Sequence, residues 1–137
     1  MARNSLKHLT ENEKAALREL VERLQERYGP SLVTVKLFGS KARGDFDADS
    51  DVDVLVVVQT ADDWEAQREI SGIGYGIDLK YEVLLSELAM TIKRYNQHRR
   101  YRSPLYRNLV KEGVNLWTKA RKSSLASVSA EAEKSWP

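Results

Sequence analysis

Two short segments of this chain combine residue types that suit phosphate and metal chemistry. Gly39-Ser40 follows an apolar run that ends at Phe38, and ten residues separate Ser40 from Asp51-Val52-Asp53. A glycine lets the backbone come close to a phosphate, and a serine adds a hydroxyl donor. If a helical turn begins at this point, its free N–H groups also face the anion. The segment predicts a phosphate cradle beside a pair of carboxylates.

The carboxylate pair itself favours a divalent cation. Asp51 and Asp53 are two positions apart, so on a strand both project from one face. Asp53 also interrupts the apolar run from Val52 to Val58, where an unpaired buried carboxylate is costly. Hard oxygen ligands suit Mg²⁺ or Mn²⁺. The structural alternative is that Asp51 caps a turn and Asp53 pairs with an arginine, but the neighbouring Gly39-Ser40 favours a site.

Basic residues accompany these two segments. Lys41 and Arg43 can neutralise phosphate oxygens, Arg43 through two parallel hydrogen bonds. From Gly39 to Glu69 the chain has nine acids against three bases, and from Thr91 to Lys122 it has ten bases against one acid. An acidic segment followed by a basic one suits a metal site beside a polyanion site, whereas the alternative is two solvated faces.

The pattern of apolar residues predicts the elements that position these groups. Thr10 with Glu13 is typical of a capping box that opens a helix, and Gly29-Pro30 ends that helix. Strands are expected over 32–38, 52–58 and 77–85, with a loop over 39–50. A helix is expected to begin at Asp62 or Asp63 and to be broken by Gly72, Gly74 and Gly76. A second helix is expected from Ser86 through Tyr95. A third is expected from Pro104 to Gly113, followed by a short strand or turn over 114–117.

These elements predict one α+β domain, an α/β sandwich in which a short mixed β-sheet has helices on one face. The domain is expected over residues 1–118, and the Ser/Ala/Glu-rich segment 119–137 is expected to be disordered. The composition, 42% hydrophobic and 31% charged, is typical of a soluble globular protein. The chain contains no cysteine, which excludes disulfides and thiolate chemistry. The N-terminus has no apolar core and no run is long enough to span a bilayer, so a cytoplasmic protein without a membrane partner is expected.

The string Phe38-Gly-Ser-Lys-Ala-Arg-Gly, followed by Ser50-Asp-Val-Asp, resembles the signature of the DNA polymerase beta superfamily, in particular the minimal nucleotidyltransferases. The segment Ser103 to Trp117 is similar to the C-terminal helix of those short proteins. The resemblance implies a nucleotidyltransferase fold, ATP as substrate and Mg²⁺ or Mn²⁺ as cofactor. It implies that Asp51 and Asp53 are catalytic metal ligands and that Gly39, Ser40, Lys41 and Arg43 bind the nucleotide.

Active members of this family carry a third carboxylate on the next strand. The expected strand over 77–85 contains Asp78 and Glu82 on one face. Ile77-Asp-Leu-Lys resembles the strand that carries this carboxylate in the family, so Asp78 is favoured as the third catalytic and metal-ligating residue, with Glu82 as the alternative.

The resemblance also implies a function. Many minimal nucleotidyltransferases act as antitoxins that attach AMP to a tyrosine of a HEPN-domain ribonuclease toxin. A metal-dependent protein adenylyltransferase with a HEPN-type partner is therefore expected. Two alternatives stay open: a non-catalytic antitoxin of the same fold that acts by binding its partner, and, ranked lower, a small-molecule adenylyltransferase.

A weaker signal lies in the segment 93–107, where bases alternate with Tyr95, Tyr101 and Tyr106. Such a pattern suits a solvated helix face, a surface for a partner protein, or nucleic acid bound by charge and stacking. Nucleic acid is the least favoured of the three.

Overall fold

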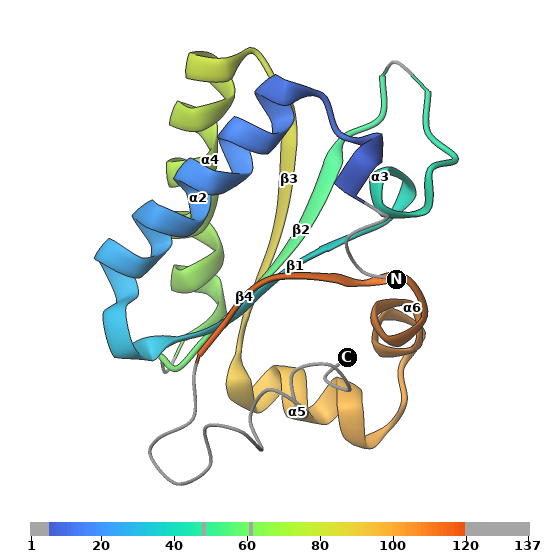
Figure 1. Ribbon diagram of the computed structural model, residues 1–137. Coiled ribbons are helices and arrows are strands. Elements are labelled where there is room, and N and C mark those ends of the chain that lie inside the picture. Colours follow the sequence, from blue (N-terminus) through green and yellow to red (C-terminus); the bar gives the residue numbers. More distant parts are fainter. Residues whose placement is uncertain (1–5, 48, 61, 120–137) are drawn as a thin grey trace, which may run out of the picture.

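The structure is a computed structural model that describes residues 6–47, 49–60 and 62–119. Its centre is a four-stranded sheet in the order β3-β2-β1-β4 (Figure 1). The strands are β1 (Leu32–Phe38), β2 (Val52–Val58), β3 (Leu85–Thr91) and β4 (Val114–Thr118). β1 is antiparallel to β2 and β4, and β2 is parallel to β3. The predicted α+β class with a mixed sheet is confirmed.

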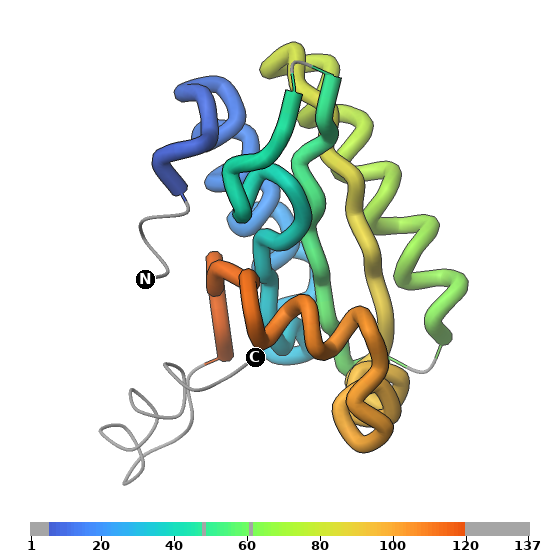
Figure 2. Tube along the Cα trace, turned by 90° about the vertical axis from the view of Figure 1, so that its right-hand side faces the viewer, coloured from blue at the N-terminus to red at the C-terminus, as the bar shows by residue number. Residues whose placement is uncertain are grey.

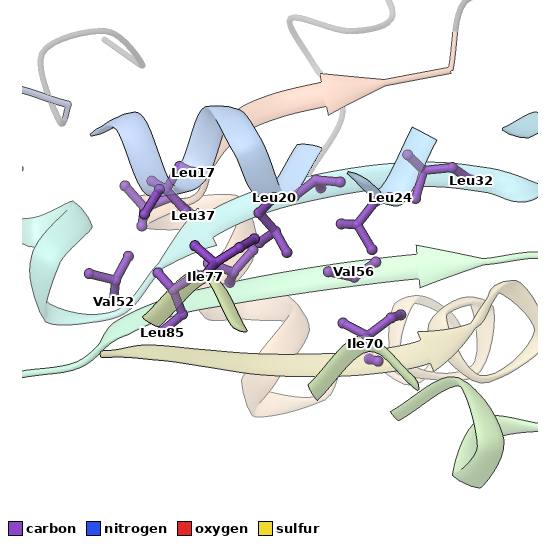
Figure 3. Close-up of a cluster of buried hydrophobic side chains, with 14 of the residues drawn as sticks. Leu17, Leu20, Leu24, Leu32, Leu37, Val52, Val56, Ile70, Ile77 and Leu85 are labelled. Atoms are coloured by element: carbon purple, nitrogen blue, oxygen red, sulfur yellow. The ribbon is translucent and has the colours of Figure 1, made fainter. Parts of the chain in front are cut away.

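One face of the sheet is covered by two long helices, α2 (Glu11–Tyr28) and α4 (Asp63–Tyr81). The predicted capping box opens α2: the Glu13 N–H donates to Thr10 Oγ1 at 3.0 Å, and the Thr10 N–H donates to Glu13 Oε1 at 2.9 Å. A short helix η1 (Leu6–His8) precedes α2, and η2 (Gly29–Ser31) follows it. Leucines and isoleucines from both helices meet the sheet in one buried cluster, part of which Figure 3 shows: Leu17, Leu20, Leu24, Ile70, Ile77, Val52 and Val56.

The opposite face carries a smaller cluster under α5 (Ile92–Arg100) and α6 (Pro104–Glu112), so helices cover both faces of the sheet and not one face as predicted. Tyr95 of α5 and Tyr106 and Leu109 of α6 pack there against Leu55 and Val57 of β2. Figures 1 and 2 show both helices on the side of the sheet away from α2. Pro104 occupies the first turn of α6, as predicted, and β4 is the expected short strand.

Two predictions about the middle of the chain were wrong. The segment 77–85 is not a strand, because α4 continues to Tyr81, and the segment after Ser86 is not a helix, because β3 spans Leu85–Thr91. The glycines of α4 do not break it. Each costs about 1 kcal/mol relative to alanine, but Ile70 and Ile77 on the buried face hold the helix against the sheet. Tertiary packing therefore outweighs local propensity over this stretch.

Apart from Lys119, the tail predicted to be disordered lies outside the described residues. None of the helices that the structure describes has the length and apolar character needed to cross a bilayer.

Candidate active site

The site forms where β1 ends and β2 begins. In the antiparallel pair, Phe38 lies opposite Asp53, so Gly39 follows β1 directly beside the Asp53 side chain. Gly39 has φ = +80°, and a Cβ added to it would overlap the Asp53 carboxylate. A side chain at this position would therefore displace the carboxylate. Only glycine allows the backbone and the carboxylate to be this close.

Asp53 faces the side of the sheet that carries α5 and α6. Its neighbours along β2 on that face are Leu55 and Val57, whereas Val52, Val54, Val56 and Val58 pack toward α2 and α4. Asp51 is exposed and directly precedes β2. Burial raises the pKa of Asp53, and the negative charge of Asp51 raises it further. The structure therefore brings the two predicted carboxylates close enough to repel.

Ser40 begins the short helix α3 (Ser40–Arg43), immediately after Gly39. The Ala42 and Arg43 N–H groups donate to the Gly39 carbonyl, each at 3.1 Å, and the Gly44 N–H donates to the Ser40 carbonyl at 2.7 Å. These bonds hold the Gly39-Ser40 backbone in one tight turn beside Asp53.

The two predicted phosphate-binding bases form ion pairs with carboxylates of the protein itself. Lys41 is 5% exposed; its Nζ lies 3.0 Å from Glu13 Oε2 and 4.2 Å from the centre of the Phe46 ring. Lys41 thus ties α3 to the start of α2, which favours a structural role. Arg43 is more exposed and donates from Nε to Asp45 and from Nη1 to Glu112.

Glu112, the last residue of α6, belongs to the site although sequence reasoning did not assign it there. Its Oε2 accepts the Gly39 N–H at 2.8 Å, and both of its carboxylate oxygens accept from Arg43 Nη1, at 3.2 and 3.0 Å. Its side chain is 11% exposed. The available signal was charge: Glu112 is the one acid among ten bases between Thr91 and Lys122.

Neither candidate for the third carboxylate lies on a strand. Asp78 lies on α4, and Glu82 is exposed in a left-handed conformation just after that helix. The residue of β3 paired with Asp53 is Ser86, whose hydroxyl is near enough to the Asp53 carboxylate to lower its pKa. On the site face of β3, a serine therefore stands beside Asp53 where a carboxylate was expected.

Asp78 instead belongs to a row of α4 side chains that cover the outer edge of β3. Asp78 Oδ1 accepts the Leu85 N–H at 3.0 Å. Gln67 accepts the Ala89 N–H at 2.8 Å and donates to the Glu87 carbonyl at 2.9 Å. Further along, Asp63 accepts the Thr91 N–H at 2.7 Å. An uncovered edge strand invites pairing with another chain, and the bond from Leu85 to Asp78 helps to cover this edge.

The donor set fits a hard divalent cation. Mg²⁺ is commonly held by one or two carboxylates together with substrate phosphates, and Asp51 and Asp53 supply two carboxylates whose charges interact. Burial and the charge of Asp51 both raise the pKa of Asp53, and a bound cation would offset both effects by stabilising the negative charge. Within residues 6–47, 49–60 and 62–119, no three His, Asp or Glu side chains form a metal-binding group by themselves.

Comparison with known proteins identifies the family. The family model of the nucleotidyltransferase domain matches residues 17–114, which include both β1 and β2 and most of the other elements. The chain belongs to the nucleotidyltransferase domain family. The predictions that it has this fold and is an enzyme of this class are confirmed.

Two proteins of Methanocaldococcus jannaschii, both named as predicted protein adenylyltransferases, are similar to this chain. The first is 29% identical over 106 residues, which cover 77% of this chain and 99% of that protein. The second is 44% identical over 54 residues, which cover 39% of this chain and 54% of that protein.

Two solved structures share the fold. A predicted nucleotidyltransferase from Sulfolobus solfataricus superposes with a TM-score of 0.54 at 22% identity, covering 84% of this chain and 91% of that one. A chain from a toxin–antitoxin structure with AMP-PNP superposes with a TM-score of 0.50 at 20% identity, covering 85% and 86% of the two chains.

Proposed function

We propose that this nucleotidyltransferase transfers AMP from ATP to a hydroxyl group of a protein, and that the acceptor is a tyrosine of a HEPN-type ribonuclease toxin. The observation that carries the proposal is the contact between the Gly39 backbone and the Asp53 carboxylate, with Asp51 beside it. The names of the Methanocaldococcus jannaschii relatives support a protein as acceptor. The toxin partner is supported by the minimal-nucleotidyltransferase motif and by the fold shared with a toxin–antitoxin chain.

Each residue of the site has a part in this reaction. Gly39 and Ser40 seat the β- and γ-phosphates, and the tight turn of α3 keeps their backbone in place. Asp51 and Asp53 would hold Mg²⁺ or Mn²⁺, which supplies positive charge against the triphosphate when bound. The acceptor hydroxyl gives its proton to water and its oxygen bonds to the α-phosphorus. The bond from the α-phosphorus to the oxygen that bridges to the β-phosphorus breaks, and pyrophosphate leaves with that oxygen. Positioning and electrostatic stabilisation supply most of the rate enhancement in such transfers.

A second candidate function is inhibition of the toxin by binding alone. Ser86 favours it, because a serine occupies the position beside Asp53 where a third carboxylate was expected. Under this alternative the protein would keep the nucleotide site but would not modify its partner.

Nucleotide binding gives the first test. ATP titrated into the protein by isothermal calorimetry should bind at least about tenfold more tightly with Mg²⁺ than with excess chelator, because two like charges face the phosphates when no cation is present. As a control, the variant Lys14→Ala, which changes a residue of α2, should show the same dependence of ATP affinity on Mg²⁺ as the wild-type protein. Equal ATP affinity in both buffers would contradict the assignment of Asp51 and Asp53 as metal ligands.

A further inference from the structure

Exposed bases gather on α5, on α6 and in the turn between them. We give the name α5–α6 basic surface to six of them: Lys93, Arg94, Arg100, Arg102, Arg107 and Lys111. Figures 1 and 2 show the two helices joined at one end of the molecule. We propose that the α5–α6 basic surface docks an acidic segment of the protein acceptor. The proposal rests on the proposed function, because the docked protein is the one that receives AMP.

The first argument is that these charges are not neutralised. Within the part of the chain that the structure describes, none of the six forms an ion pair with an acid. Bases elsewhere do form such pairs: Lys14, Arg23, Arg27, Lys41, Arg43 and Lys80. Glu112 is the acid of α6, and it bonds Gly39 and Arg43 instead. An unpaired cluster of one sign attracts a partner of the opposite sign and speeds its association.

The second argument is that the surface reaches the active site. α6 ends at Glu112, whose carboxylate accepts the Gly39 N–H at 2.8 Å. Lys111 directly precedes Glu112, and Arg107 lies about one turn earlier on the exposed side of the helix. A nine-residue helix is about 13 Å long. A segment bound along α6 could therefore place a nearby tyrosine at the phosphate cradle.

The third argument favours a protein over a nucleic acid. Val110 is 54% exposed and, three residues after Arg107, lies next to it on the surface of α6, and Tyr101 is 74% exposed in the turn. Protein interfaces combine arginine and aromatic residues with apolar contacts. An exposed valine offers nothing to a phosphate backbone. The guanidinium of Arg107 also donates to the Arg102 carbonyl at 2.8 Å, which fixes the turn.

The test uses a synthetic acidic copolymer of glutamate and tyrosine as the probe, since it carries the proposed chemistry without requiring the natural partner. Its binding to the full chain is measured by biolayer interferometry without ATP. The double variant Arg107→Glu/Lys111→Glu should bind at least about tenfold more weakly, because two attractive contacts become repulsive. The matched control is Arg68→Glu, which reverses an exposed base on α4, on the other face of the sheet. This control should bind as wild type does, and a lysine–tyrosine copolymer should not bind.

Three results would overturn the proposal: no binding of the acidic copolymer, equal weakening by Arg68→Glu, or tighter binding of a single-stranded RNA of equal charge. Circular dichroism and ATP calorimetry on the double variant would show that its fold and nucleotide site are intact. Because the readout is binding without ATP, it separates docking from chemistry. A wild-type protein that binds the copolymer but never modifies its toxin would contradict the proposed function and leave the docking surface standing.

Discussion

The two faces of the sheet differ in composition and in what they can do. Toward α2 and α4, β2 presents four buried valines to a large apolar cluster, and the surface bases of those helices are mostly ion-paired. Toward α5 and α6, the same strand presents Asp53 and two apolar residues to a smaller cluster, beside unpaired bases. Because successive residues of a strand face opposite sides, β2 contributes to the main core on one face and, on our proposal, to catalysis on the other.

One residue on the apolar face departs from this division. Glu87 of β3 points toward α4, and a Cβ added to Gly74 would overlap its carboxylate. Its Oε2 is buried, and none of the described residues gives it a hydrogen bond. Gly74 therefore makes room for this carboxyl group within α4, although sequence patterns suggested that it would end the helix.

The largest effect is expected at Gly39. Gly39→Val should reduce AMP transfer by at least about 100-fold, because the new side chain displaces Asp53 and valine disfavours φ = +80°. Ser40→Ala, which removes one donor, should cost about tenfold. Steady-state transfer rates and thermal melts measure activity and folding separately. A Gly39→Val protein that transfers AMP as wild type does would show that the phosphate cradle is misplaced.

A smaller loss of activity is expected at Glu112. Glu112→Ala leaves the Gly39 N–H without its acceptor and should lower kcat for AMP transfer by about tenfold. Glu112→Gln keeps one carbonyl acceptor for that N–H and should lose less. Asp45→Asn changes the other, exposed partner of Arg43 and is the control. Equal losses from Glu112→Ala and Asp45→Asn would mean that Glu112 only pairs with Arg43 and does not position the cradle.

Glu87 gives a prediction about stability on the face of the sheet that packs against α2 and α4. Burial raises the pKa of Glu87 from its ordinary value of 4.5 to about 7, and the charge of Asp78 adds to this. Between pH 4.5 and about 7, the folded protein therefore keeps the Glu87 carboxyl group protonated, whereas the unfolded chain has lost that proton. Stability should fall as pH rises from about 4.5 through about 7.

Glu87→Gln removes this dependence. At pH 8 the variant should be more stable than wild type, by on the order of 1 kcal/mol, and at pH 4 it should show no gain. Urea unfolding at the two pH values measures the difference, and AMP transfer should stay unchanged. A gain of the same size at both pH values would show that the effect is packing and not ionisation.

Much of this molecule could be predicted from local sequence. The capping box at Thr10, the strands β1 and β2 and the first-turn proline of α6 each have a local cause. The contact between Gly39 and Asp53 also follows from order along the chain, since β1 and β2 are joined by one short connection.

The remainder depends on contacts between distant segments. α4 continues through three glycines because its apolar face packs on the sheet. The strand that follows is therefore Leu85–Thr91 and not the predicted 77–85, and its residue Ser86 pairs with Asp53. Asp78 has the residue type of a metal ligand, but its hydrogen bond to Leu85 exists only once α4 lies along β3. Glu112 is 73 residues from Gly39 in the chain, so no local pattern could have joined them.

The central claim is that Asp53 serves AMP transfer to a protein tyrosine. The most direct test mixes the purified protein with its cognate HEPN-type partner, ATP and Mg²⁺, and records the intact mass of the partner. We predict a gain of about 329 Da per AMP attached, located on a tyrosine. Asp53→Asn should abolish this gain while complex formation and thermal stability persist. If the partner gains no mass yet is still inhibited, or if Asp53→Asn modifies it as wild type does, the enzymatic account is contradicted.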